Sequence, residues 1–426
     1  MGILEWVMVA IFVIGYAAIA LEHKIGLDKA ASAIVTGVLL WVFYALSGER
    51  NALVEGNLME HLGDISSVLF FLLSAMAIVT LIDLHNGFSV ITNRIHTTSK
   101  ARLLWILSLL AFFLSALLDN LTTTIVMISL IDKVLQDRED KVYFSSFMII
   151  AANAGGAFSP IGDVTTTMLW IGGQITTLEI MKDTFLASFF VLLIPLIVVS
   201  FRFRGQTLAL KDKNARAKDE ANARIMLICG VVALMAVPVF KQLTHLPPIM
   251  GMLLSLGFMW IVTSRLHRNK THDSRRKFSV SHALEIVDTP TIFFFLGILL
   301  AVSALQSHGL LNLLASWVNY TTSDVRLIGL AMGILSAIID NVPLVAAVQG
   351  MYSLETFPTD HAFWQIIALA CGTGGSMIII GSAAGVAAMG MQKIDFFWYL
   401  KKMGWLAFLG FLSGSLVFWL QHALTS

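Results

Sequence analysis

The chain has few charged residues. Asp, Glu, Lys and Arg together make up only 13% of its 426 residues, and 57% of the residues are hydrophobic. A soluble domain usually carries about a quarter charged residues, so this composition indicates an integral membrane protein. The formal net charge is only +1. We therefore expect the lipid bilayer as its surroundings, and no nucleic acid or acidic macromolecule as its partner.

Cysteine is scarce as well. The two cysteines, Cys229 and Cys371, lie far apart in apolar segments and form no metal-ligand or redox pattern. No glycine-rich phosphate loop, zinc spacing or nucleophile triad is present either. These absences disfavour an ATP-driven pump and an enzyme, and we expect no cofactor. The apolar N-terminus is not a typical signal peptide, because its first basic residue, Lys24, follows the apolar run instead of preceding it.

A short motif occurs twice in the chain. Ser115–Leu121 reads SALLDNL and recurs as SAIIDNV at Ser336–Val342, each time inside a long apolar stretch. Each copy places a carboxylate and an amide at membrane depth, where charged groups are costly and usually mark an ion or proton path. The repetition indicates two related halves, as in secondary transporters.

Apolar segments of membrane-spanning length predict an all-α polytopic membrane protein. Ten spans are expected, approximately at residues 3–21, 30–47, 65–83, 142–178, 184–202, 225–241, 248–265, 290–306, 361–392 and 404–421. Two further stretches, 101–136 and 326–354, are interrupted at the repeated motif. Because each half is too short for a comfortable span of the bilayer, we expect re-entrant hairpins whose tips meet near the midplane.

The loops predict the orientation, because basic residues are enriched on the cytoplasmic side. Basic residues lie on both sides of the first hairpin, within the 204–224 segment and within the 265–277 loop. Acidic residues gather at 49–64 and beside the second hairpin. Five spans and one hairpin per half is an odd number of crossings, so the halves should be inverted. We expect a first repeat at residues 1–203, a cytoplasmic linker at 204–224, a second repeat at 225–426, and both termini outside.

The span after each hairpin contains helix-breaking residues. Asn153-Ala-Gly-Gly and Ser159-Pro-Ile-Gly-Asp interrupt 142–178, and Gly372-Thr-Gly-Gly and Gly381-Ser interrupt 361–392. Unwound backbone at membrane depth is tolerated where it lines a cavity, and its helix ends can coordinate ions. Four broken elements should therefore converge on one central site.

The residues at these breaks supply the hard oxygen ligands that a sodium ion requires. The candidate ion-binding residues are Asp119, Asn120, Asn153, Asp163, Thr165, Thr166, Ser336, Asp340, Asn341 and Ser382, with Ser115, Thr122, Ser159 and Thr373 as weaker candidates. Sodium itself is expected at Asp119, Asn120, Asp163, Asp340 and Asn341. Because burial disfavours a charged carboxylate, protons and cations should compete there. A lone hydroxyl in a membrane helix, however, more often bonds across a helix interface.

Two further residues could sense pH. His85 follows a predicted span, and Glu22 lies in a predicted cytoplasmic loop. A solvated group at a helix end is the ordinary alternative for both.

At the two Asp-Asn motifs and the Asn153–Thr166 segment, the chain resembles the NhaD-type sodium/proton antiporters of the ion transporter superfamily. The resemblance implies exchange of sodium or lithium for protons, and a transport domain that moves against a dimeric scaffold. The same superfamily contains dicarboxylate, citrate and arsenite carriers, which are the main alternative; a non-transporting membrane scaffold is the other. The aspartates at the hairpin tips favour a cation as the substrate, because an anion would bind better at helix N-termini without acidic side chains. We expect a homodimer in a bacterial inner membrane.

Overall fold

The computed structural model describes residues 2–20, 22–47, 51–92, 97–208, 220–268, 271–322 and 324–425. Within these ranges helices are joined by turns and loops, with an isolated antiparallel β-bridge between Ser99 and Thr207. The principal helices before the linker are α1 Ile3–Ala20, α3 Lys29–Ala45, α4 Asn51–Leu84, α6 Lys100–Leu118, α7 Asn120–Val134, α8 Arg138–Gly156, α9 Val164–Ile171 and α10 Thr177–Arg202.

The principal helices after the linker are α11 Glu220–Thr244, α12 Pro248–Leu266, α15 Thr289–Ser307, α16 Leu310–Thr321, α17 Val325–Ser336, α18 Asn341–Met351, α19 Ala362–Gly374, α20 Ala383–Gln392 and α22 Trp405–Thr425. Short helices fill the connections: α2 Glu22–Ile25, α5 Ser89–Thr92, α13 His272–Lys277, α14 Val280–Ile286 and α21 Phe396–Tyr399, which continues into a π-helical turn at Leu400–Gly404.

Seven helices in the described residues are long and apolar enough to cross a membrane. Six of them coincide with predicted spans. The predicted spans at 142–178 and 361–392 are interrupted as expected, into α8 and α9 and into α19 and α20. The chain is therefore an all-α polytopic membrane protein.

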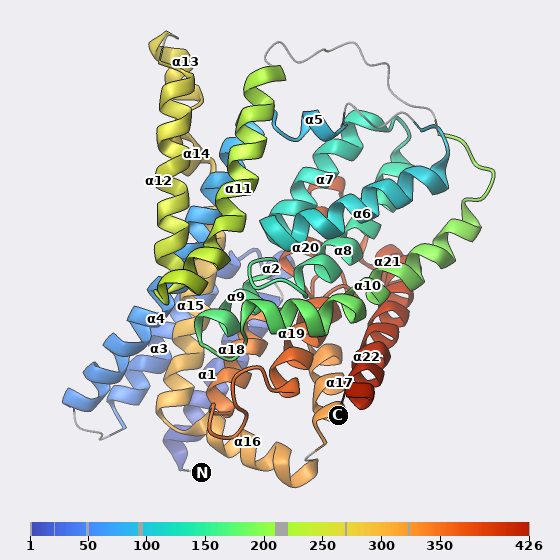
Figure 1. The fold of residues 1–426 in the computed structure, drawn as a ribbon. Coiled ribbons are helices and arrows are strands. Elements are labelled where there is room, and N and C mark those ends of the chain that lie inside the picture. Colours follow the sequence, from blue (N-terminus) through green and yellow to red (C-terminus); the bar gives the residue numbers. More distant parts are fainter. Residues whose placement is uncertain are drawn as a thin grey trace.

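Two details of the prediction are wrong. The acidic segment at residues 51–64, expected as an outer loop, forms the first turns of the 34-residue helix α4, because it is rich in good helix formers and contains no proline. The first arm of the hairpin at 101–136, expected to be too short, is the 19-residue helix α6, which is itself long enough to cross. Figure 1 shows α6 running obliquely, so its length does not carry it straight through the molecule.

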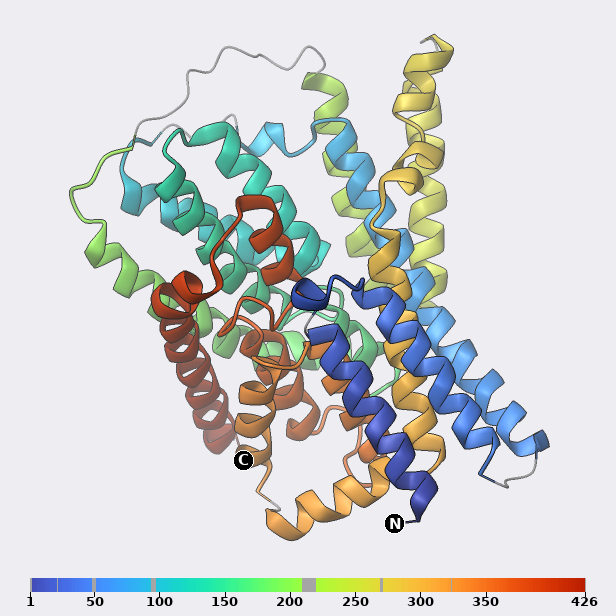
Figure 2. The same ribbon diagram turned by 180° about the vertical axis from the view of Figure 1, so that it is seen from behind.

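The helices form two groups. In one group α3 packs between α1 and α15, and α12 packs between α11 and α4. Figure 2 shows α1 and α3 on the face that Figure 1 views from behind. The other group contains α6–α8, α10, α17, α19 and α22. In Figure 1 the hairpin of α6 and α7 occupies its upper part and the hairpin of α17 and α18 its lower part.

Matched glycines bring the two halves to the same local packing. A Cβ atom on Gly155 would overlap the carbonyl of Phe112, and a Cβ on Gly374 would overlap the carbonyl of Gly333. In each half the helix that precedes the break therefore lies directly against the first arm of the neighbouring hairpin. Only glycine permits this approach of two backbones.

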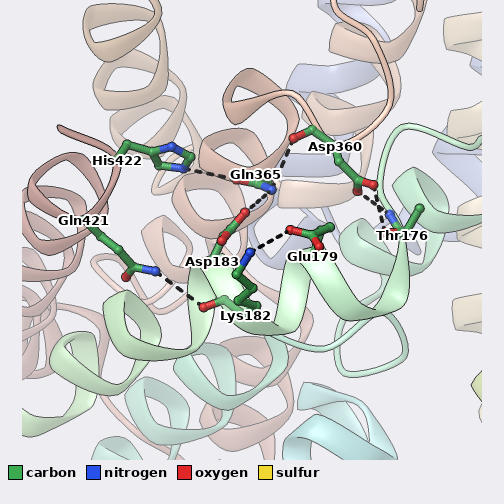
Figure 3. Close-up of polar contacts among 8 residues, drawn as sticks. All are labelled: Thr176, Glu179, Lys182, Asp183, Asp360, Gln365, Gln421 and His422. Carbon is green, nitrogen blue, oxygen red and sulfur yellow. Dashed lines mark hydrogen bonds and ion pairs between the residues drawn. The ribbon is translucent and has the colours of Figure 1, made fainter. Parts of the chain in front are cut away.

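A polar network joins α10 to α19 and α22 within the second helix group (Figure 3). Gln365 donates to Asp183 Oδ2 at 2.8 Å and to the Asp360 carbonyl at 3.3 Å, and its Oε1 lies 3.2 Å from His422 Nε2. Asp360 in turn accepts from the backbone N–H and the hydroxyl of Thr176 at 2.6 and 2.8 Å. The network fixes the start of α10 and holds the group as a unit.

Candidate ion-binding site

The carboxylate of Asp163 lies at the centre of the candidate site and is only 1% exposed. Asn120 donates from Nδ2 to Asp163 Oδ2 at 2.8 Å, and Asn341 donates to Oδ2 and Oδ1 at 3.2 and 3.3 Å. Asn120 begins α7 and Asn341 begins α18. Asn120 and Asn341, at the starts of the second arms of the two hairpins, therefore both donate to one buried carboxylate.

Asn153 extends this cluster to the second broken helix. Its Oδ1 accepts from Asn120 Nδ2 at 3.0 Å, while its own Nδ2 donates to the hydroxyls of Ser382 and Ser376 at 3.0 and 2.9 Å. Ser376 and Ser382 both lie in or beside the break between α19 and α20. A continuous hydrogen-bond network thus joins all four broken elements.

Asp163 is also the N-cap of α9, which explains how its carboxylate is held. Its Oδ1 accepts from the backbone N–H of Thr165 at 3.0 Å, and Thr166 completes a capping box with the Asp163 backbone. Oδ2 remains directed at the amides of the hairpin tips. The local sequence Asp-Val-Thr-Thr therefore both starts the helix and orients the carboxylate.

Four helices begin at this cluster: α7, α9, α18 and α20. The N-terminus of a helix carries a partial positive charge, which stabilises nearby negative charge. Asp119 and Asp340 lie close enough to Asp163 to repel it electrostatically. The site therefore places three carboxylates among the positive ends of helices.

Asp119 occupies the gap between α6 and α7 in an unusual backbone conformation. Its φ and ψ are 77° and 159°, a region that side chains other than glycine rarely adopt. Its carboxylate accepts from the backbone N–H and the hydroxyl of Thr122, both at 2.7 Å. Asp119 and Asp163 together line a cavity of about 10 Å³, which is about the room that one water molecule or a bare cation needs.

Asp340 faces a different space. Its Oδ1 accepts from the backbone N–H of Val342 at 3.1 Å, and its own N–H donates to the Tyr16 hydroxyl at 2.8 Å. It lines a second cavity, of about 50 Å³, together with Tyr16, Glu22 and Lys29, and Lys29 attracts its charge. Within the described residues, no three acidic, histidine or cysteine side chains surround one point. Asp340 thus lines a different cavity from the one that Asp119 and Asp163 share.

Four of the predicted hydroxyl ligands donate to backbone carbonyls of neighbouring segments or of their own helix. Ser115 donates to the Ala152 carbonyl at 2.6 Å, and Ser336 makes the matching bond to the Cys371 carbonyl at 2.7 Å. Ser159 and Thr373 likewise donate to backbone carbonyls, of Ala116 and Leu369, both at 2.6 Å. These hydroxyls fasten the hairpins and the broken helices to their neighbours.

The two candidate pH sensors lie apart from the central cluster. His85 is buried just after α4, with its Nε2 2.7 Å from His267 Nε2. Glu22 lies beside Asp340 in the second cavity. Sequence reasoning missed Tyr16, Lys29, His267 and Ser376. Only Ser376 carried a signal, because it lies within the predicted glycine-rich interruption.

Comparison with known proteins gives a consistent family. The sequence profile of the citrate transporter family (CitMHS) matches residues 3–374. A protein of Arabidopsis thaliana named sodium/proton antiporter 1 is 46% identical over 98% of this chain and 72% of its own length. The Na(+)/H(+) antiporters NhaD of Alkalimonas amylolytica and Vibrio cholerae are 30% and 31% identical over 94% and 92% of this chain, and over 87% and 86% of their own lengths.

These matches cover both hairpins and the broken helix α8–α9, where the Asp163 cluster is built. The chain therefore belongs to the citrate transporter family of the ion transporter superfamily, within its NhaD-type antiporters.

Proposed function

We propose that this protein exchanges sodium or lithium for protons across a membrane, without covalent chemistry and without a cofactor. The observation that carries the proposal is the buried Asp163 carboxylate, which accepts hydrogen bonds from the tips of both hairpins. A group held by both halves of the molecule is well placed to report ion occupancy to both.

The charge arrangement favours a cation over citrate or another anion. Four helix N-termini around a point would normally bind an anion from solution. Here that position is filled by the carboxylate of Asp163, and Asp119 and Asp340 add further negative charge. A di- or tricarboxylate would meet three like charges, whereas a cation would be attracted.

Exchange then follows from competition for the same carboxylates. Sodium in the small cavity between Asp119 and Asp163 requires both groups to be ionised. A proton taken up by either carboxylate removes a ligand charge and releases the cation. The amides of Asn120 and Asn341 can turn to offer their carbonyl oxygens to the ion. Thr165 and Thr166 bond to Asp163, and Ser382 accepts from Asn153; direct ion binding by these three residues stays a prediction.

The inverted-repeat arrangement, with both termini outside, is part of the same proposal. The matched contacts of Gly155 and Gly374 support it. Figure 1 supports it as well: both chain ends lie in the lower part of the molecule, whereas α13 and the start of α11 lie at the top. The termini and the loops that are expected to be cytoplasmic therefore lie at opposite ends. Most of the linker at 204–224 lies outside the described residues. The homodimer and the bacterial inner membrane stay predictions.

The decisive test is transport in proteoliposomes that contain the purified protein and a pH-sensitive dye. Sodium and lithium should dissipate an imposed proton gradient, whereas citrate and succinate should not. The apparent sodium Km should rise as pH falls, because protons compete for the same carboxylates. Empty liposomes provide the control. A gradient that collapses with citrate but not with sodium would establish the anion-carrier alternative.

We further propose that His85 adjusts the pH range of transport. His85 Nδ1 lies 2.7 Å from the Leu81 carbonyl, which can only accept, so Nδ1 carries a hydrogen. His85 and His267 then share one hydrogen between their Nε2 atoms, 2.7 Å apart. The pair can gain one further proton, but a second would set two N–H groups against each other. Among the described residues, the charged or titratable side chains at the same end of the adjoining elements include Asp83, Arg224, Arg265, Arg268, Arg275, Arg276, Lys277, His282 and Glu285.

Replacing His85 by Gln should shift the acid limb of the rate–pH profile while preserving the rate at alkaline pH. The profile should be measured at saturating sodium, so that a change in Km does not enter. His282→Gln is the control, because His282 lies on the nearby α14 in a surface pair with Glu285. Superimposable profiles for His85→Gln and the wild type would refute the role. A role for Glu22 remains a prediction.

A further inference from the structure

A cavity of about 490 Å³ lies outside the ion-binding site, where α6 and α8 begin and α10 ends. Trp398 of α21 and Lys402 of the π-helical turn at Leu400–Gly404 also line it. Figure 1 shows α10 and α21 approaching each other on the right flank of the molecule. The proposed transport cycle does not use this cavity.

Its lining is predominantly basic. Four cationic side chains face it, Lys100, Arg138, Arg202 and Lys402, against two anionic ones, Glu139 and Asp140. Lys100 is paired with Asp140 at 2.6 Å. In the part of the chain that the structure describes, Arg138, Arg202 and Lys402 form no ion pair. The cavity thus offers cationic groups whose charge the protein itself does not fully neutralise.

Two amphipathic aromatic residues lie in the same lining. The rings of Tyr143 and Trp398 meet edge to face with their centroids 6.3 Å apart, and the Arg202 guanidinium lies over the Tyr143 ring at 5.5 Å. Tyr and Trp beside Lys and Arg at helix ends are typical of the level of lipid headgroups. The lining therefore has the composition that is typical of the membrane surface.

The chain adopts an irregular conformation where it supplies Lys402. The π-helical turn Leu400–Gly404 separates α21 from α22 and carries this residue into the cavity lining. A π-helical turn is rare and often occurs at functional sites. This backbone feature is independent of the charge count.

We propose that this cavity binds the phosphate group of an anionic phospholipid through Arg138, Arg202 and Lys402. A basic pocket between membrane helices is a known form of headgroup site, and guanidinium groups match phosphate oxygens well. A soluble phosphate ion shares this chemistry, so the test separates the two sources. The proposal does not rest on sodium/proton exchange.

The test compares the whole protein in nanodiscs of phosphatidylcholine with and without phosphatidylglycerol. Native mass spectrometry should find phosphatidylglycerol retained by the wild type, and Arg138→Gln/Arg202→Gln/Lys402→Gln should reduce retention about tenfold or more. Inorganic phosphate is titrated separately by calorimetry. Retained lipid without a phosphate signal identifies the headgroup; a phosphate signal that the variant loses, without lipid retention, identifies the soluble ion.

Two variants control for general charge and for folding. Arg268→Gln/Arg276→Gln/Lys277→Gln removes the same charge from exposed positions on and beside α12 and α13 and should leave retention unchanged. Arg138→Lys/Arg202→Lys/Lys402→Arg keeps the charge and should restore most of it. Equal retention in the wild type and the Gln variant, with no phosphate signal, overturns the proposal; so does equal loss in the two Gln variants. Sodium-dependent flux is measured separately, in phosphatidylcholine alone, so that a failure of the proposed exchange is distinguished from a failure of lipid binding.

Discussion

Replacing Asp163 by Asn should nearly abolish sodium-dependent proton flux while leaving a folded protein. Asn keeps the shape of the side chain and can still accept from the Thr165 N–H, which caps α9. It loses the charge that pairs with a buried cation. Losing one partner of a buried ion pair costs about 3–5 kcal/mol, which corresponds to about 100-fold or more in affinity.

The measurement is the initial flux in proteoliposomes, normalised to the amount of monodisperse protein. Asp324→Asn is the matched control, because Asp324 caps α17 through the same contact to the residue two positions on, Arg326, at 2.8 Å, but is exposed. It should retain flux within about twofold. Asp163→Glu keeps the charge and should retain measurable exchange. Wild-type flux in Asp163→Asn would remove Asp163 from the mechanism.

Much of the fold could be predicted because the bilayer imposes a length on apolar segments. The breaks after Gly155-Gly156 and Gly374-Gly375 could also be predicted from the sequence, because paired glycines weaken a helix. The structure shows that Gly155 and Gly374 also permit a close approach of two backbones. Residues 51–64 were mistaken for a loop because acidic side chains signal the membrane surface but do not prevent a helix. Hydropathy reports depth in the membrane, whereas helix formation depends on the local backbone.

The centre of the site could be predicted because repeated carboxylates and amides at membrane depth are costly and rare. The hydrogen-bond partners of the hydroxyls could not be predicted from the sequence. Sequence shows that Ser115 and Ser336 carry a donor, but the carbonyls that accept from them belong to other helices. Tyr16 and Lys29 were missed for the same reason, because α1 and α3 reach Asp340 only through tertiary packing.

Asp119 offers the second large effect, and its backbone makes the test specific. Asp119→Asn preserves the cap on α7 and leaves the strained backbone, with φ 77° and ψ 159°, as it is in the wild type. It removes one of the two carboxylates that line the small cavity. We expect flux to fall about 10–100-fold, the range found when a group that supports a metal site is lost. Flux is measured as for Asp163→Asn.

Asp288 provides a closely matched control. It caps α15 through Thr291, three residues on, accepting from its N–H at 3.4 Å and its hydroxyl at 2.6 Å, just as Asp119 binds Thr122. If Asp119 served only as a cap, Asp119→Asn and Asp288→Asn would have the same small effect. Asp119→Gly separates the roles further, since glycine relieves about 1–3 kcal/mol of backbone strain. A more thermostable but inactive Asp119→Gly protein would show that the strained aspartate is retained for transport, whereas an active one would contradict its role.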